Sequence, residues 1–174
     1  MRKASLNKQK SSSVLAKIIA ITLFTITLKV AALDIGKFAP DFTLKNTQGK
    51  NLNLAEQRGK IIVINFWASW CGPCRKEMPV LQTFHSKYEN LGVSVWGVNV
   101  EQENQAGRDF LADLHLSFPI FFDSSNQVSA SYQVEAMPTT VIVDRNGKVR
   151  YVFRGYKDGY ERKYAKAIKK LIRE

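Results

Sequence analysis

Cysteine and histidine are scarce in this chain of 174 residues, which has two of each. A structural zinc site needs four ligands, usually Cys or His. His85 follows Cys74 by eleven residues, roughly 16 Å along a helix at 1.5 Å per residue, so the two side chains cannot share a metal ion. We therefore expect no metal centre, and we interpret His85 and His115 as ordinary structural or surface residues.

The chain also lacks a low-complexity tract, an internal repeat and a long apolar run. Its most apolar stretch, residues 18–28, lies between Lys17 and Lys29. About 20 residues are needed to span a bilayer. The 20 residues 14–33 reach that length only by including both lysines, so a membrane anchor is possible but not the favoured interpretation.

Basic residues precede this apolar stretch, and the small residues Val30, Ala31 and Ala32 follow it. This is the layout of a secretory signal. We predict that residues 1–33 are a signal peptide cleaved after Ala32, or a retained anchor, and that residues 34–174 form one domain. Either alternative places the domain outside the cytoplasm, in the periplasm, where the compartment is oxidising.

The net charge of +11 is unevenly distributed. Residues 1–33 carry +6, residues 34–144 carry −3 and residues 145–174 carry +8. The basic C-terminal region could contact anionic lipid or an acidic partner. We interpret its lysines, at positions 163, 166, 169 and 170, as the solvated face of a helix, and we expect no nucleic-acid partner.

Both cysteines lie in the segment Phe-Trp-Ala-Ser-Trp-Cys-Gly-Pro-Cys, residues 66–74. An apolar run precedes Cys71, and helix-forming residues follow Cys74, which predicts a strand-to-helix turn. Unpaired N–H groups and the dipole at a helix N-terminus favour thiolate over thiol. Cysteine pairs with this spacing have pKa values of roughly 3.5 to 7.5, against about 8.5 for an ordinary cysteine.

The two-residue spacing allows the cysteines to form a disulfide with each other. A disulfide that closes so short a loop contributes little stability, so a purely structural role is disfavoured. We predict that Cys71 attacks a substrate disulfide and that Cys74 resolves the resulting mixed disulfide. The dithiol itself carries the electrons, so no other cofactor is expected.

Strand and helix patterns alternate beyond residue 40, which predicts an α/β domain whose mixed central sheet has helices on both faces. A glycine in residues 46–50 and an Asn-Gly pair at 146–147 suit hairpin turns. The expected strands are residues 42–44, 52–54, 61–67, 93–100, 118–122, 139–143 and 148–153, and the expected helices are 75–88, 105–114, 127–132 and 158–172.

Residues 65–79, Asn-Phe-Trp-Ala-Ser-Trp-Cys-Gly-Pro-Cys-Arg-Lys-Glu-Met-Pro, resemble the active-site signature of exported thioredoxin-like proteins of the TlpA/ResA/DsbE group. Weaker matches occur in the expected order, at residues 36–42 before this segment and at residues 98–100, 118–119 and 137–140 after it. The resemblance implies a thioredoxin fold with an N-terminal β-hairpin and a central βα insert, in a monomer.

The resemblance also implies a cis peptide bond between Met137 and Pro138, beside the cysteine pair. Met137 could then pair its free N–H and C=O with an extended substrate, as in strand addition. We expect Met137 and Pro138 to bind substrate together with Trp70, Gly72 and Pro73.

One position departs from thioredoxins proper, which have a buried Asp where this chain has Asn65. An amide cannot exchange a proton with the resolving cysteine. Related proteins often supply a Glu just after the Val-Asn-Val strand end, and here Glu101 and Glu103 lie one residue to either side of that position. We favour Glu101 as the third catalytic residue.

Gly72 and Pro73 resemble the pair found in reducing thioredoxins, at about −270 mV, more than strong oxidants at about −120 mV. The resemblance thus implies a reductase that acts on apo-cytochrome c cysteines in cytochrome c biogenesis, with electrons from a membrane thiol-disulfide carrier. A thiol oxidase or isomerase is the alternative. A thiol peroxidase, suggested by residues 39–42, is disfavoured because Ser69 and Trp70 replace the Thr and Pro that such enzymes need.

Overall fold

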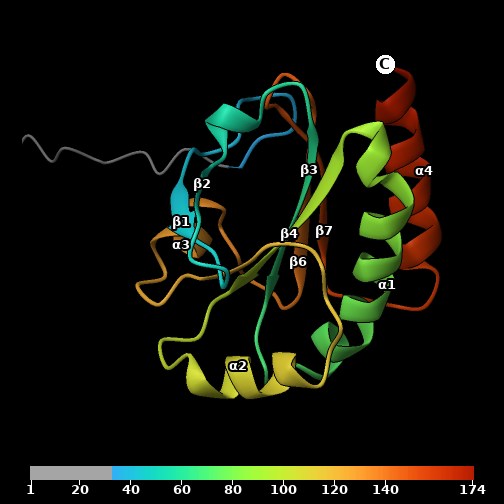
Figure 1. Cartoon of the computed structure of the whole chain (residues 1–174). Helices are drawn as coiled ribbons and strands as arrows, with labels where there is room; N and C mark the ends of the chain where they lie inside the picture. Colours follow the sequence, from blue (N-terminus) through green and yellow to red (C-terminus); the bar gives the residue numbers. More distant parts are fainter. Residues whose placement is uncertain (1–32) are drawn as a thin grey trace, which may run out of the picture. The chain divides into compact units, whose positions relative to one another are not determined.

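The computed structural model describes residues 33–174, so the signal peptide or anchor predicted for residues 1–33 lies outside the described residues, apart from Leu33. Within 33–174, none of the helices is long and apolar enough to cross a membrane. Figure 1 shows the order of the elements, which are β1 (Thr43–Lys45), β2 (Asn51–Asn53), η2 (Ala55–Gln57), β3 (Ile61–Trp67), α1 (Gly72–Tyr88), η3 (Glu89–Leu91), β4 (Val93–Asn99), α2 (Gln105–Ala112), β5 (Ile120–Phe122), α3 (Gln127–Ser131), β6 (Thr139–Val143), β7 (Val149–Arg154) and α4 (Tyr160–Arg173).

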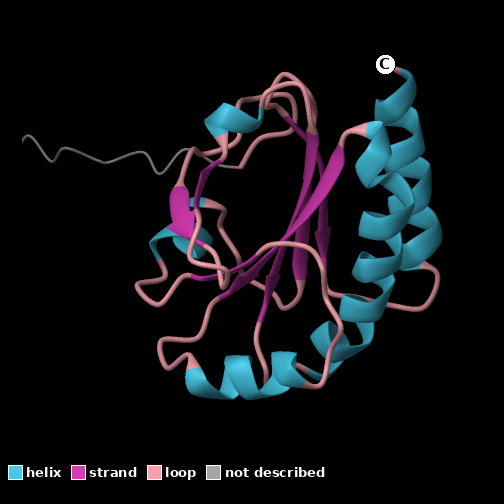
Figure 2. Ribbon diagram, viewed as in Figure 1, coloured by secondary structure: helices cyan, strands magenta, loops and turns pink. Residues whose placement is uncertain are grey.

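Five strands form the central sheet in the order β5-β4-β3-β6-β7. The strand β4 runs parallel to both β3 and β5, whereas β6 is antiparallel to β3 and β7. Figure 2 shows these strands side by side between the helices. Every residue of β3 is buried, as expected for a central strand that is covered on both faces.

Apolar side chains pack on each face of the sheet and form two separate clusters. One cluster joins the sheet to α1, α2 and α4, and it contains both cysteines. The other joins the opposite face to α3 and to the β1–β2 hairpin. Figure 1 accordingly shows α1 and α4 together on one side of the sheet, with the hairpin and α3 on the other. The predicted fold class is confirmed, including helices on both faces and the N-terminal hairpin.

Local polar contacts explain how the hairpin turns form. The side chain of Asn46 accepts hydrogen bonds from the backbone N–H groups of Gln48 and Lys50, at 3.1 and 2.9 Å. Gly49 has a φ of +83°, a conformation that glycine adopts without steric cost. The predicted turn over residues 46–50 is confirmed.

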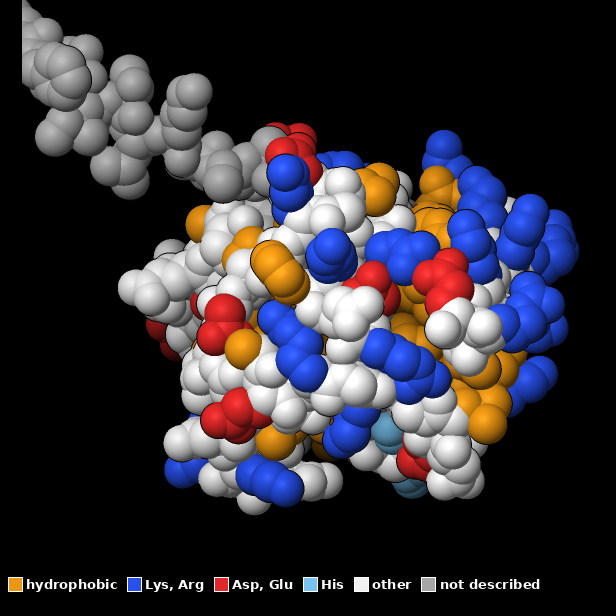
Figure 3. Space-filling model, turned by 90° about the horizontal axis from the view of Figure 1, so that it is seen from above, with side chains coloured by type: hydrophobic (Ala, Val, Ile, Leu, Met, Phe, Trp, Pro, Cys, Tyr) orange, Lys and Arg blue, Asp and Glu red, His pale blue; other side chains and the backbone are white. Residues whose placement is uncertain are grey.

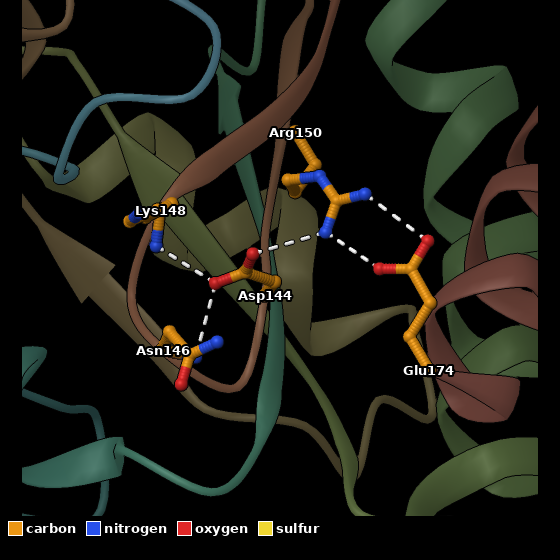
Figure 4. Close-up of polar contacts among 5 residues, drawn as sticks. All are labelled: Asp144, Asn146, Lys148, Arg150 and Glu174. Atoms are coloured by element: carbon orange, nitrogen blue, oxygen red, sulfur yellow. Dashed lines mark hydrogen bonds and ion pairs between the residues drawn. The ribbon is translucent and has the colours of Figure 1, made fainter.

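The turn between β6 and β7 also anchors the last helix (Figure 4). The carboxylate of Asp144 accepts backbone hydrogen bonds from Asn146 and Lys148, at 3.0 and 2.9 Å. Its other oxygen lies 3.1 Å from Arg150, whose guanidinium also binds the side chain of Glu174 at 2.7 and 3.1 Å. The C-terminal end of α4 is thereby tied to the β6–β7 hairpin.

Two predicted element ends differ from the structure for identifiable reasons. The helix predicted from residue 75 begins at Gly72, because Cys71 serves as its N-cap. The strand predicted from residue 118 begins at Ile120. Pro119, which precedes it, has no N–H to donate into a ladder, although its carbonyl still accepts a bond from the N–H of Gly97 at 2.9 Å.

A side chain at Gly97 would disturb the packing between β4 and β5. A Cβ there would lie 2.6 Å from Cδ1 of Ile120 and 3.3 Å from Nε1 of the fully buried Trp67. We predict that Gly97→Ala lowers the free energy of unfolding by about 1–3 kcal/mol, measured by urea denaturation. The control Ser94→Ala, at a half-buried position of the same strand, should cost less. Equal stability of Gly97→Ala and the parent chain would contradict this packing.

Candidate active site

The two cysteines form a disulfide at the start of α1, with an S–S distance of 2.05 Å and a Cα–Cα distance of 5.3 Å. Cys71 is the N-cap, and its sulfur accepts a hydrogen bond from the backbone N–H of Cys74 at 3.2 Å. That contact is one of the donor interactions that favour a thiolate in the reduced form. Cys71 is 4% exposed and Cys74 is 1% exposed, so Cys71 is the more accessible residue of the pair.

The residues around Cys71 make an exposed surface. Trp70 is 70% exposed, which is unusual for so large an apolar side chain. Gly72 and Pro73 are also exposed, between the two buried cysteines. These three predicted substrate-binding residues are therefore accessible to a partner, whereas Trp67 is fully buried.

The peptide bond between Met137 and Pro138 is cis, as the family resemblance implies. Phe66 of β3 pairs with Thr139 of β6 in antiparallel register, so the start of β6 lies beside the end of β3 that leads to Cys71. Met137 is half-buried and packs against the cluster that contains both cysteines. Within residues 33–174 its backbone N–H and C=O have no hydrogen-bond partner, so both can pair with another chain.

Glu101 holds the turn that precedes the cysteines. Its carboxylate accepts hydrogen bonds from the N–H and the hydroxyl of Ser69, at 2.8 and 2.7 Å, and from the amide of Asn99 at 2.7 Å. Partial burial would raise the pKa of Glu101, but these hydrogen bonds outweigh it and keep the pKa below its ordinary value. Glu103 is exposed.

A group that exchanges protons near neutral pH needs a raised carboxyl pKa. The lowered pKa of Glu101 therefore suits an anchor for Ser69 better than a proton carrier. The proton-exchange role of Glu101 stays a prediction.

Glu77 is a further candidate residue of the site, for which no role was predicted from the sequence. Glu77 is fully buried on α1, three residues after Cys74 and so on the same helix face. Its carboxylate accepts hydrogen bonds from the amide of Asn65 at 2.9 Å and from the hydroxyls of Thr140 and Tyr164 at 2.8 and 2.7 Å. Burial raises the pKa of Glu77, against the opposing effect of its three donors. A buried carboxyl with a raised pKa, three residues after Cys74 on the same helix, is chemically suited to proton exchange.

Helical spacing was the signal in the sequence that could have found Glu77. Cys74, Met78 and Leu81 lie on the buried side of α1, and a glutamate at position 77 falls on that same side. A carboxylate on an apolar helix face is seldom buried unless hydrogen-bond donors or a countercharge satisfy its oxygens. Its three partners come from distant parts of the chain, and no local pattern in the sequence indicated them.

The histidines lie away from any such arrangement. His85 is buried beside Phe118, with 5.9 Å between the ring centroids, and His115 is exposed. Within residues 33–174, no group of three or more His, Cys, Asp or Glu side chains is placed to hold a metal ion.

Comparisons with known proteins agree with this geometry. Residues 35–152 match the AhpC/TSA family. The chain is 38% identical over 124 residues to the thiol-disulfide oxidoreductase ResA of Geobacillus thermodenitrificans, covering 71% of each chain. It is 35% identical over 124 residues to ResA of Bacillus subtilis, covering 71% of this chain and 69% of that protein.

Solved structures share the fold. A crystal structure assigned to a thiol:disulfide interchange protein DsbE of Chlorobium tepidum superimposes with a TM-score of 0.78 at 34% identity, covering 81% of this chain and 99% of that one. The structure of StoA from Bacillus subtilis gives a TM-score of 0.62 at 28% identity, covering 72% of this chain and 96% of that one.

The contacts of Glu101 predict a pH-dependent contribution to stability. Because its pKa is lowered on folding, Glu101 stabilises the fold above its ordinary pKa of 4.5, and this contribution is lost as the pH falls through the lower folded value. We predict that Glu101→Gln lowers the free energy of unfolding by about 1–2 kcal/mol at pH 7, and by less at pH 3. Denaturant unfolding at both pH values measures this.

The matched control for this experiment is Glu103→Gln, which removes a nearby exposed charge. It should leave the stability nearly unchanged at both pH values. A Glu101→Gln chain as stable as the parent at pH 7 would show that Glu101 does not anchor Ser69.

Proposed function

The chain belongs to the AhpC/TSA family and, within it, to the thiol-disulfide oxidoreductases of the TlpA/ResA/DsbE type, and from this we propose that it reduces disulfides of client proteins outside the cytoplasm. The observation that carries the proposal is the Cys71–Cys74 disulfide at the N-terminus of α1, with the buried carboxyl of Glu77 three residues after Cys74 on the same helix. The exposed surface beside Cys71 gives a client access to the reacting sulfur.

The first step requires the reduced form of the protein. The Cys71 thiolate attacks one sulfur of the client disulfide, and a bond forms between that sulfur and Cys71. The client disulfide breaks, and its second sulfur leaves as a thiolate that takes a proton from solvent. The start of α1 stabilises the attacking thiolate through its N–H groups and its dipole.

The second step releases the client. Cys74 loses its proton and attacks the Cys71 sulfur. The internal disulfide forms, the bond between Cys71 and the first client sulfur breaks, and that sulfur leaves as a thiolate that takes a proton from solvent. Two electrons have then passed from the dithiol to the client. Glu77, in its ionised form, is the proposed acceptor of the Cys74 proton. Glu101 is the competing candidate, and its lowered pKa makes it the weaker proton acceptor.

Substrate binding follows from the same surface. The unpaired backbone groups of Met137 can bond to an extended client segment, with Pro138 beneath them, in the manner of strand addition. Trp70 supplies an apolar contact, and the exposed backbone of Gly72 and Pro73 lets the client approach the disulfide.

The proposed client and electron donor follow from the family resemblance. Apo-cytochrome c is the proposed client, in cytochrome c biogenesis, and a membrane thiol-disulfide carrier is the proposed donor that restores the dithiol. Residues 1–33, as signal peptide or anchor, would place residues 34–174 in the periplasm. The proposed oligomeric state is a monomer.

Figure 3 shows Lys and Arg side chains gathered on one side of the molecule. Those of α4 include Lys163, Lys166 and Lys170, and we retain the interpretation of a solvated helix face.

The match to the AhpC/TSA family leaves thiol peroxidase as a second candidate. Both cysteines of the chain are joined in one disulfide, the state left after either activity. Peroxide consumption by the reduced protein at a rate that exceeds disulfide reduction would favour the peroxidase. Net oxidation of a reduced client by the disulfide form would favour the oxidase.

Substitution of each cysteine in turn tests the proposed function. We predict that Cys71→Ser abolishes the reduction of insulin disulfides. Cys74→Ser should still attack, because Cys71 remains, but it should accumulate a mixed disulfide that mass spectrometry detects under non-reducing conditions. Insulin reduction by Cys71→Ser at the parent rate, or a mixed disulfide through Cys74 in that variant, would contradict the assignment of Cys71 as nucleophile.

A further inference from the structure

We propose that Tyr164, from the C-terminal helix, is a positioning residue that sets the proton affinity of Glu77 and thereby the pH range in which Cys74 can resolve a mixed disulfide. This inference rests on the proposed function, because it assigns a consequence to the proton exchange between Glu77 and Cys74. Tyr164 lies outside the cysteine motif, 87 residues from Glu77 in the chain.

The contact is short and fully enclosed. The hydroxyl of Tyr164 donates to Oε1 of Glu77 at 2.7 Å, and both residues are 0% exposed. The Thr140 hydroxyl donates to the same oxygen at 2.8 Å, and the Asn65 amide donates to the other at 2.9 Å. The amide of Asn65 also donates to the Thr140 hydroxyl at 2.9 Å, which leaves the Thr140 proton directed at Glu77.

When Glu77 is ionised, the groups of residues 33–174 that stabilise its negative charge are these neutral hydrogen-bond donors. Within residues 33–174, no Lys, Arg or His forms an ion pair with Glu77. The titratable groups that interact with it are Tyr164 from α4 and Tyr156 from the loop before α4, and Cys74 lies three residues earlier on its own helix. Because a buried carboxylate without a countercharge depends on hydrogen bonds, removal of one donor shifts its balance towards the protonated form.

Tyr164 is held in place by its ring rather than by its hydroxyl. The ring packs edge-on against Phe153, with 4.8 Å between centroids, and against Phe84 and Tyr160 at 6.3 and 6.2 Å. Burial, followed by the negative charge of Glu77, raises the pKa of Tyr164, so the hydroxyl stays a donor at every working pH. A phenylalanine at position 164 would keep the ring contacts and delete only the donor.

The consequence has a definite sign. Glu77 accepts the Cys74 proton only when it is ionised, so resolution slows as the pH falls through the pKa of Glu77. With two donors in place of three, the carboxylate binds its proton more tightly, and this acid limit moves to higher pH. A hydrogen bond to a charged group corresponds to a shift of about one to two pH units.

The experiment compares the full chain with Tyr164→Phe and with the control Tyr160→Phe. Tyr160 is half-buried on the same helix, and its hydroxyl makes no hydrogen bond within residues 33–174. Infrared difference spectroscopy follows the protonated carbonyl of Glu77 from pH 4 to pH 9, with Glu77→Gln to assign the band. Stopped-flow measurement of mixed-disulfide resolution over the same pH range gives the acid limit of the reaction.

We expect Tyr164→Phe to raise the infrared midpoint and the acid limit of resolution together, by about one to two pH units, and Tyr160→Phe to leave both unchanged. Incorporation of 3-fluorotyrosine at position 164 strengthens the donor and should lower both values, which keeps the test available if Tyr164→Phe does not fold. An infrared midpoint that is the same in the parent, Tyr164→Phe and fluorotyrosine chains would overturn the inference.

The experiment distinguishes failure of the Tyr164 role from failure of the proposed reductase function. An unmoved midpoint with normal disulfide exchange removes the role of Tyr164 and leaves the proposed reductase intact. Absence of disulfide exchange by the parent chain at every pH would instead remove the proposed function, and with it this inference.

Discussion

The central strand β3 is buried along its whole length, and this constraint fixes the positions of the groups around the disulfide. Its end leads directly into the turn that carries Cys71. The neighbours of β3 then bring distant residues to the same place: β6 follows Met137 and Pro138, and β4 leads to Glu101, which binds the turn at Ser69. Cys71 thus lies at the end of a short turn between β3 and α1, and Cys74 lies in the first turn of α1.

A second constraint comes from the buried carboxyl of Glu77, three residues after Cys74 on α1. Burying Glu77 is unfavourable unless its oxygens find donors, and three side chains from β3, β6 and α4 supply them. Asn65 is one of them. Where thioredoxins proper have an acid, this chain has an amide that donates to an acid on the next helix. In the proposed mechanism the proton-exchanging group is therefore Glu77 on α1 and not a residue of the strand, and the last helix contacts it through Tyr164.

Much of the fold could be predicted because its signals are local. The continuous apolar run of β3 gave its exact bounds, Ile61–Trp67, and the Asn-Gly pair marked the last hairpin. Helical spacing could have placed Glu77 on the buried side of α1, but its hydrogen-bond donors could not be predicted, because they lie 12, 63 and 87 residues away and only the folded chain brings them together. Glu101 could be placed near the site, but its contact with Ser69, 32 residues away, could not be predicted.

The central claim is that Cys71 and Cys74 form a reducing couple that cycles between dithiol and disulfide. The reduction potential of this pair, obtained by equilibrating the protein in thiol-disulfide buffers of known potential, tests the claim most directly. We predict a reduction potential of about −270 mV, as in reducing thioredoxins. A value above about −150 mV would contradict it, because such a pair would accept electrons from client thiols instead of donating them.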